Sequence, residues 1–335
     1  MRGKDYFEAY IDGYDKVVVY MSKQSYEGKS SRFFLKDSKD RIIDLKICSV
    51  EDKQSNYRKY NLEIEEDLII GEEYYVYHEH ARKTIAEYSY IVKTERFDEE
   101  FYYEGNDLGA MYSRRHTCFA LWAPTAFRIV LELKRGNGVC EAFEMKRGSR
   151  GVWRVCVPGN LKGTAYTYHV RVNGEWRETI DPYAFCGGAN STVSAICDLE
   201  SIRFKQYPLP AMRSACDAVI YEASVRDFTS QPGIGVEHPK TFRGFVEENA
   251  VTEAMQTGFS YLKSLGITHV QLMPVFDFGS VDETYPQMFY NWGYDPVHYR
   301  CLEGIYSTDV LSYDARMREF GQLVETCHKN GIRVN

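Results

Sequence analysis

The spacing of hydrophobic residues changes near residue 217, and this change most constrains how the 335-residue chain can fold. Up to about residue 200, apolar residues occur in short runs that are separated by turn residues. This pattern is typical of β-strands. After residue 217, strand-like runs are separated by stretches with helical spacing, as in a parallel α/β unit. The sequence therefore predicts β domains followed by an α/β domain.

Residues 1–104 are predicted to form an all-β domain. Helical periodicity is poor there, and turn signals recur at short intervals. The acidic segment Glu95–Gly109 ends in turn residues and places the boundary near residues 100 to 107. The expected strands are Lys16–Met21, Arg41–Cys48, Glu73–His78 and Tyr88–Val92.

The motif His78-Glu79-His80 lies in this first region. On a strand its two imidazoles would face the same side and could begin a metal site. A third ligand at motif spacing is not evident, so the motif favours a half-exposed strand pair. We predict no metal site and no cofactor, and calcium dependence stays open.

Residues 105–200 are predicted to form a second all-β domain, an immunoglobulin-like β-sandwich. The pair Asn173-Gly174 is a strong hairpin signal. Within the run Ala165–Val172, alternate residues from Tyr166 onward share one face, which we expect to lie in the core. The other expected strands are Thr117–Ala123, Arg128–Leu133, Gly151–Val157 and Trp176–Ile180.

Residues 201–216 are predicted to be a linker and residues 217–335 an incomplete (β/α)₈ TIM barrel. A complete barrel needs about 250 residues, so we expect the front part of a longer protein. The expected strands are Ala218–Val225, Ile267–Val275 and Ile332–Val334. The expected helical faces are Met255, Phe259, Leu262 and Leu265, ended by Gly266, and Met317, Phe320, Val324 and Cys327, ended by Gly331.

Composition excludes several classes of partner. The formal net charge of −7 argues against nucleic acid. No apolar run approaches the roughly 18 residues that span a bilayer, and the N-terminus lacks the apolar core of a signal peptide.

The nine cysteines are odd in number and contain no Cys-x-x-Cys motif. They predict buried thiols in a reducing compartment, with the cytoplasm as the default.

The segment Tyr290–Pro296 is the candidate functional motif, and it follows the second predicted strand of the α/β region. In a parallel barrel, this loop would lie at the carboxyl ends of the strands, where active sites form. Its three aromatic rings, one amide and one carboxylate suit a sugar pocket. The alternative is a loop that fills the end of the barrel with aromatic side chains. The chain contains 27 tyrosines and 18 phenylalanines, which fit either β structure or carbohydrate binding.

Tyr290–Pro296 resembles the signature of type I pullulanases, the starch-debranching members of the alpha-amylase family of glycoside hydrolases. Asp217–Phe228 and Gly258–Val275 are similar to the first strand, first helix and second strand of that family's barrel. The segments Phe119–Ala126 and Asp181–Ala184 resemble the family 48 carbohydrate-binding module. The segments Phe7–Tyr10 and Phe97–Tyr103 resemble the N-terminal domain of the short bacterial forms.

The resemblance implies hydrolysis of α-1,6-glucosidic bonds in pullulan, glycogen and limit dextrins, with retention of configuration. The partner is then an α-glucan polysaccharide. In the family the catalytic carboxyls follow later barrel strands, so we assign no catalytic residue within this chain. The adjacent acidic residues that could substitute are expected to be solvated surface: Glu247–Glu248, Asp282–Glu283 and Asp98–Glu100.

The resemblance also implies substrate-binding residues. Tyr294 matches the tyrosine that stacks on the sugar before the cleaved bond, and Tyr290, Asn291, Trp292 and Asp295 belong to the same loop. We expect Asp295 to hold the loop through backbone hydrogen bonds and Trp292 to pack within it.

In the carbohydrate-binding module, Trp122 is expected in the core. Trp153 and Trp176 are the surface candidates for glucan binding. Two other functions stay open: a non-catalytic glucan-binding or scaffold protein, and another debranching or branching enzyme of the alpha-amylase family. Tyr290–Pro296 favours a pullulanase over the latter.

Overall fold

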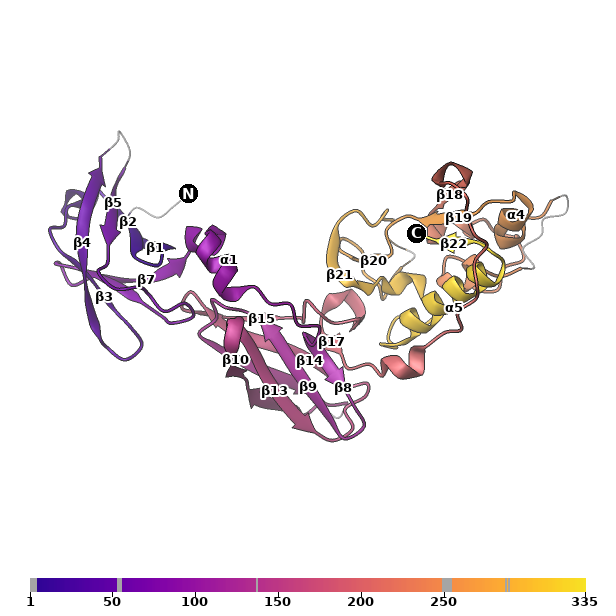
Figure 1. Cartoon of the computed structure of the whole chain (residues 1–335), viewed down its shortest axis with the longest axis horizontal. Coiled ribbons are helices and arrows are strands. Elements are labelled where there is room, and N and C mark those ends of the chain that lie inside the picture. The colour runs from indigo at the N-terminus through magenta and orange to yellow at the C-terminus, as the bar shows by residue number, and fades with distance from the viewer. Residues whose placement is uncertain (1–4, 53–55, 137, 249–254, 287, 289) are drawn as a thin grey trace.

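The computed structural model describes residues 5–52, 56–136, 138–248, 255–286, 288 and 290–335. The protein is mostly β and consists of three lobes arranged in a row (Figure 1). The N-terminal lobe lies at one end, a β-sandwich lies in the middle, and a strand–helix lobe lies at the other end.

Seven strands of the N-terminal lobe close into a barrel in the order β1-β2-β5-β4-β3-β6-β7. The parallel pairing of β1 with β7 closes it, so each of the seven described strands pairs on both sides. The predicted all-β character is confirmed. The strands are β1 (Phe7–Gly13), β2 (Lys16–Ser22), β3 (Phe33–Lys36), β4 (Ile42–Glu51), β5 (Tyr57–Glu63), β6 (Tyr75–His78) and β7 (Lys83–Tyr88).

The predicted strand Tyr88–Val92 is wrong. Strand β7 ends at Tyr88, and Tyr90–Lys93 form a 3₁₀ turn that buries Ile91. The helix α1 (Glu95–Phe101) follows, with the Thr94 hydroxyl accepting a hydrogen bond from the Phe97 backbone N–H at 3.3 Å. Phe97 and Phe101 are buried against the barrel core, so α1 closes one side of the barrel.

The middle lobe is a sandwich of two antiparallel sheets, as predicted. Tyr166 and Tyr168 are fully buried between the sheets, on the face expected from the alternation. The first sheet contains β10 (Arg128–Lys134), β11 (Cys140–Glu144), β14 (Ala165–Val172), β15 (Glu175–Thr179), β16 (Cys186–Gly187) and β17 (Ser194–Ala195). The second contains β8 (Gly109–Tyr112), β9 (His116–Trp122), β12 (Lys146–Arg147) and β13 (Val152–Pro158).

The third lobe contains a parallel sheet in the order β18-β19-β22, with α4 and α5 beside it. The predicted order of strand, helix, strand, helix and strand corresponds to β18, α4, β19, α5 and β22, but the short elements α2, α3, β20 and β21 lie where only loops were expected. The helix α4 begins at Gly258 and leaves Met255 outside, with 70% of its surface exposed. The elements are β18 (Ile220–Ala223), α2 (Val225–Phe228), α3 (Phe242–Phe245), α4 (Gly258–Ser264), β19 (His269–Leu272), β20 (Phe276–Phe278), β21 (Pro296–Leu302), α5 (Ala315–Lys329) and β22 (Arg333–Val334).

Charged groups join the first two lobes. The guanidinium of Arg171 makes two hydrogen bonds, of 2.8 and 2.9 Å, to the carboxylate of Glu73, which is only 8% exposed. The guanidinium of Arg147 donates to the carbonyl oxygens of Ile70 in the first lobe and Pro124 in the second. These bonds satisfy polar groups that the contact removes from water.

The sandwich also contacts the third lobe directly. A ring nitrogen of the buried His298 lies 2.7 Å from the carbonyl oxygen of Asp181. The Ser191 hydroxyl donates to the Asp277 carboxylate at 2.6 Å. The segment that follows β15 therefore packs on the β20–β21 pair.

The prediction of nine buried thiols is wrong. Cys118 and Cys156 lie opposite each other on paired strands and form a disulfide, and Cys186 forms a second one with Cys197. Spacing along the chain does not show which cysteines a sheet register brings together, so the inference of a reducing compartment loses its basis. Of the five free cysteines, only Cys301 and Cys327 are buried.

Each helix in the described part of the chain is too short or too polar to cross a bilayer.

Replacing Arg171 with Met should weaken the joint between the first two lobes. The change leaves the Glu73 carboxylate buried without its partner, and we expect the free energy of unfolding to fall by about 2 kcal/mol. Arg128→Met, which breaks an exposed ion pair with Glu144 in the same sandwich, should cost less than about 1 kcal/mol. Denaturant titration of both variants measures this. Equal losses, or no recovery on adding Glu73→Gln to Arg171→Met, would contradict the assignment.

Candidate functional site

The segment Tyr290–Pro296 lies in the third lobe, in the loop between the antiparallel strands β20 and β21. Strands β18, β19 and β22 are parallel, so their carboxyl ends meet at one edge of the sheet. The Tyr290 hydroxyl donates to the carboxylate of Asp227 at 2.5 Å, and Asp227 follows the carboxyl end of β18. The loop therefore lies at the edge predicted from the sequence.

Asn291 and Asp295 hold the loop in place. The Asn291 amide nitrogen donates to the Gly279 carbonyl at 2.9 Å and to the Asp295 carboxylate at 2.7 Å. The Gly293 N–H donates to the Asn291 side-chain oxygen at 2.9 Å. Gly293 has a φ of 88°, and a Cβ there would lie 3.0 Å from the Pro274 carbonyl oxygen. The fold of the loop thus requires both the amide and the glycine.

The role expected for Asp295 was partly wrong. Its backbone oxygen does accept a hydrogen bond, from the Gly279 N–H at 3.0 Å. Its carboxylate, however, bonds the side chain of Asn291 and no backbone group of the described residues. The Asn291 side chain is therefore the one of this pair that bonds to backbone groups, at Gly279 and at Gly293.

Three aromatic side chains of the loop face solvent. Tyr290, Trp292 and Tyr294 are 56%, 59% and 64% exposed. The expectation that Trp292 packs within the loop is therefore wrong; its indole N–H donates to the Tyr290 hydroxyl at 2.7 Å and leaves the ring in water. Such rings are available to stack on a sugar.

Tyr294 also lines a cavity of about 500 Å³ beside the sheet. Its other walls are largely apolar and come from the end of β19, the face of α5 and β22, including Leu272, Val324 and Val334. An apolar cavity with a few polar groups at its rim is the usual form of a small-molecule site.

Beneath the loop lie three buried carboxyl groups, Asp277, Glu283 and Glu303, with the fully buried Arg316. Glu303 accepts hydrogen bonds from the backbone N–H groups of Phe278 and Ile305. Arg316 donates to Glu283 at 3.2 Å and to the Leu302 carbonyl at 2.9 Å. This cluster ties β20, β21 and α5 together below the exposed rings.

The cluster holds three carboxyl groups and one guanidinium, and burial shifts the pKa of two of the carboxyls. Burial raises the pKa of Asp277 to about 6. Burial, and then the negative charge of Glu283, raise the pKa of Glu303. The cluster is not a substitute catalytic pair, because all three carboxyls are at most 2% exposed.

Glu283 was expected at the surface with Asp282 and is buried instead. The signal for this lay in α5: Arg316 precedes Phe320 by four residues and so lies on the helix face that packs inward. A buried guanidinium requires a carboxylate partner. The partner itself, more than thirty residues earlier in the chain, could not be identified from spacing.

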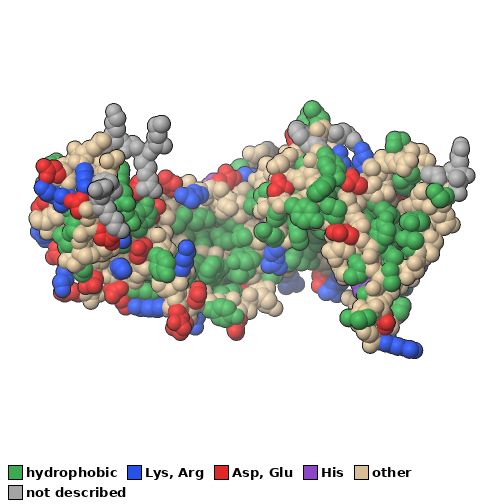
Figure 2. Space-filling model, turned by 90° about the horizontal axis from the view of Figure 1, so that it is seen from above, with side chains coloured by type: hydrophobic (Ala, Val, Ile, Leu, Met, Phe, Trp, Pro, Cys, Tyr) green, Lys and Arg blue, Asp and Glu red, His purple; other side chains and the backbone are tan. Residues whose placement is uncertain are grey.

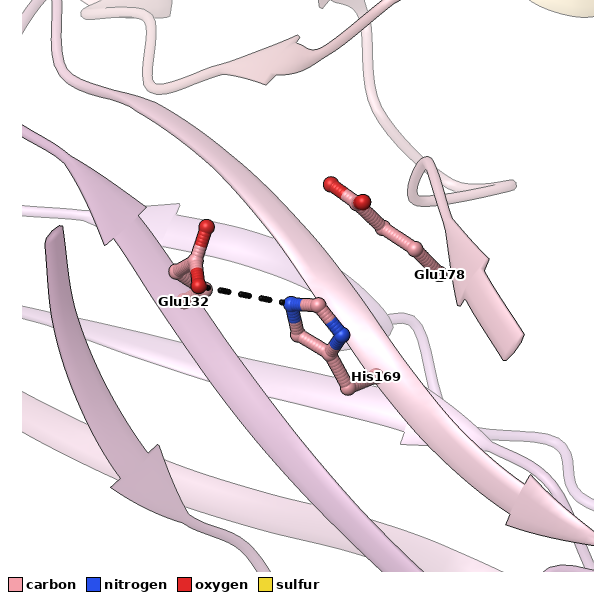
Figure 3. Close-up of side chains that lie close together, drawn as sticks. All are labelled: Glu132, His169 and Glu178. Atoms are coloured by element: carbon pink, nitrogen blue, oxygen red, sulfur yellow. Dashed lines mark ion pairs between the residues drawn. The ribbon is translucent and has the colours of Figure 1, made fainter. Parts of the chain in front are cut away.

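Two groups of side chains were considered as metal sites: the pair His78 and His80, and a group of one histidine with two glutamates. His78 is buried and packs edge-on against Phe7, and His80 stacks on Tyr26, so in the described part of the chain no third ligand joins them. Figure 3 shows Glu132, His169 and Glu178 on adjacent strands of the sandwich. The ammonium of Lys134 lies 2.8 Å from Glu178 and 3.9 Å from Glu132, so a protein cation already balances these carboxylates.

The tryptophans of the sandwich are placed differently from the prediction. Trp153, expected at the surface, is 5% exposed and donates to the Ala123 carbonyl within the core. Trp122, expected in the sandwich core, packs against the core of the N-terminal barrel. Trp176 is 44% exposed, with the Arg128 guanidinium over its ring, and stays a candidate.

Comparison with known families matches the first two lobes separately. Residues 7–93 match the pullulanase N1-terminal domain. Residues 107–184 match carbohydrate-binding module 48, also described as the isoamylase N-terminal domain.

Individual relatives match nearly the whole chain. The pullulanase of Bacillus subtilis strain 168 is 33% identical over 98% of this chain and 45% of its own length. The crystal structure of a pullulanase from Anoxybacillus sp. LM18-11 superposes with a TM-score of 0.92 at 36% identity, over 98% of this chain and 47% of that one. The same pullulanase has been solved with maltotriose, with a TM-score of 0.91. The chain thus spans less than half the length of these relatives.

The carboxyl cluster should make stability fall as pH rises. Between the ordinary aspartate pKa of about 3.9 and the folded pKa of about 6, the folded state binds more protons than the unfolded state, so the free energy of unfolding decreases with pH. Asp277→Asn removes this dependence. We expect the variant to gain about 2 kcal/mol relative to the parent protein between about pH 4.5 and about pH 7.

Denaturant titrations at the two pH values measure the gain. Asp309→Asn, at an exposed position in the same lobe, is the control and should show none. A difference between Asp277→Asn and the parent that is constant with pH would count against a proton on this cluster.

Proposed function

Because the chain carries the N-terminal domains of the pullulanase family and matches its relatives over nearly all of its length, we propose that it is the N-terminal part of a starch-debranching glycoside hydrolase. The complete enzyme would hydrolyse α-1,6-glucosidic bonds in pullulan, glycogen and limit dextrins, with retention of configuration. The observation that carries this proposal is the TM-score of 0.92 over 98% of the chain.

The proposed domains follow the three lobes. Residues 1–104 form the N-terminal domain, residues 105–200 the immunoglobulin-like carbohydrate-binding module, and residues 201–216 a linker. Residues 217–335 form the first part of a (β/α)₈ barrel. The parallel order β18-β19-β22 supports this part, as does the position of the Tyr290–Pro296 loop at the carboxyl ends of the strands.

Within that barrel, the exposed loop would form one wall of the substrate cleft. Tyr294 provides a ring on which a glucosyl unit stacks, and Trp292 and Tyr290 extend the aromatic surface. Asn291 and Asp295 act indirectly, because their side chains bond each other and hold the loop. The carboxyl cluster below supports β20 and β21.

A retaining glycosidase needs two carboxyl groups about 5 to 5.5 Å apart on either side of the scissile bond. Beside the aromatic loop, the exposed carboxylates of Asp227 and Asp295 already accept hydrogen bonds from Tyr290 and Asn291, respectively. The buried cluster cannot reach a sugar. We therefore assign the nucleophile and the acid/base to the part of the enzyme that corresponds to the remainder of the relatives.

Because both catalytic carboxyls are assigned outside this chain, a second candidate function for the chain by itself is α-glucan binding without hydrolysis. Its exposed rings at Tyr294 and Trp176 lie on different lobes. A 1,4-alpha-glucan branching enzyme of Jannaschia is also related, at 29% identity over 68% of this chain. The higher identity and wider coverage of the pullulanases favour debranching over branching.

The purified 335-residue chain should release no reducing sugar from pullulan, whereas the Bacillus subtilis pullulanase assayed beside it should. The expectation follows because we assign both catalytic carboxyls to the part of the enzyme that corresponds to the remainder of the relatives. Measurable turnover that Asp227→Asn abolishes would overturn the assignment, because it would place the chemistry within this chain.

A further inference from the structure

The side chains of Trp292, Tyr290 and Asp227 form a chain of hydrogen bonds in the third lobe. The Trp292 indole N–H donates to the Tyr290 hydroxyl at 2.7 Å, and that hydroxyl donates to the Asp227 carboxylate at 2.5 Å. An indole N–H can only donate, and an ionised carboxylate can only accept. The Tyr290 hydroxyl, which does both, is therefore the link through which Asp227 acts on Trp292.

The backbone of Asp227 is held in place on both sides. Asp227 lies in the short helix α2, where its backbone N–H donates to the Ser224 hydroxyl at 3.2 Å. Val225, two residues earlier, is only 1% exposed. The ring of the next residue, Phe228, has its centre 4.5 Å from that of the fully buried Phe245. The carboxylate of Asp227 is therefore presented to the loop from a fixed position.

The two rings at the other end of this chain of bonds face water. More than half of the surface of Tyr290 and Trp292 is exposed, and Figure 2 shows hydrophobic side chains exposed on the third lobe, at the right of the view. An exposed side chain moves among several rotamers unless a contact holds it. The Tyr290 ring is held by its bond to Asp227 and by the Arg226 guanidinium, 5.4 Å from the ring centre. Trp292 is held in turn by its bond to Tyr290.

The charge of Asp227 strengthens both bonds. A hydrogen bond to a carboxylate is about twice as strong as one between neutral groups. A hydroxyl that donates to a carboxylate also becomes a better acceptor, which strengthens the bond from the indole. The hydrogen bond to Asp227 raises the pKa of the Tyr290 hydroxyl, so the phenol keeps the proton that it donates.

We propose that Asp227 is a positioning residue that orders the rings of Tyr290 and Trp292 before a ligand arrives. The assignment of an α-glucan to these rings rests on the proposed function. Ordering one such side chain at the moment of binding costs a factor of about two to ten in affinity, and ordering it in advance avoids this loss. Asp227 stands 63 residues before Tyr290 and outside the motif that located the loop, so the sequence alone assigned it no role.

Nuclear magnetic resonance of the tryptophan indole groups tests the ordering without any ligand. The 335-residue chain contains four tryptophans, and the Trp292→Phe variant identifies the signal of Trp292 by its loss. Tyr290→Phe removes the acceptor and Asp227→Ala removes the end of the chain of bonds, so both should move this signal toward that of an indole in water. Asp227→Asn keeps a side-chain oxygen that accepts from the phenol and should restore most of the shift.

The matched control is Glu248→Ala. It removes an exposed carboxylate that pairs with Lys263 in the same lobe and should leave the Trp292 signal unchanged. A Trp292 signal that Asp227→Ala leaves unmoved, or that Glu248→Ala moves as far, would overturn the proposal.

The same signal, followed during titration with maltohexaose, measures glucan binding at the loop. Asp227→Ala should weaken this binding about two- to tenfold, and Asp227→Asn should weaken it less. In a Tyr290→Phe background, Asp227→Ala should cause no further loss, because Asp227 acts through the Tyr290 hydroxyl. A further loss there would contradict the positioning role.

Failure of the proposed function gives a different result. A Trp292 signal in the parent protein that does not respond to maltohexaose would contradict glucan binding by the loop. The shift that Asp227→Ala causes in the absence of sugar would still decide whether Asp227 orders the two rings.

Discussion

The aromatic loop of the third lobe depends on the burial of one guanidinium among three carboxyl groups. Arg316 is fully enclosed, and its bonds to Glu283 and to the Leu302 carbonyl fix α5 against β21. Glu303 accepts two backbone N–H bonds in the same cluster. Since unpaired buried charges are costly, these groups permit one arrangement of β20 and β21 and so fix the base from which Tyr290, Trp292 and Tyr294 project.

The junctions between lobes also depend on buried polar groups that are paired, but each junction contains fewer charges. Glu73 and Arg171 join the barrel to the sandwich, and His298 and Asp277 join the sandwich to the third lobe. Each junction places polar groups where water is excluded and satisfies them across the interface. The aromatic loop lies near the second of these junctions, between β20 and β21, and is thus supported by contacts between lobes.

Most secondary structure could be predicted because its signals are local. Alternation identified β9, β10, β13 and β14, and Asn173-Gly174 marked the turn before β15. The motif Tyr290–Pro296 located the exposed loop. Its resemblance to the pullulanase signature agrees with the pullulanases found among the relatives of the chain. Several failures concern partners distant in sequence: the disulfide between Cys118 and Cys156, the burial of Trp153, and the pairing of Glu283 with Arg316.

The sequence by itself determined the order of two β regions and one α/β region, the position of the aromatic loop and the likeness to pullulanases. These features depend on periodicity, turn residues and a contiguous motif, all of which are local. Only the tertiary structure decided which rings face water, which carboxyls are buried and how the lobes contact each other. Burial depends on which elements pack together, and residues such as Trp122 and Phe101 meet only after two separate lobes have folded and docked.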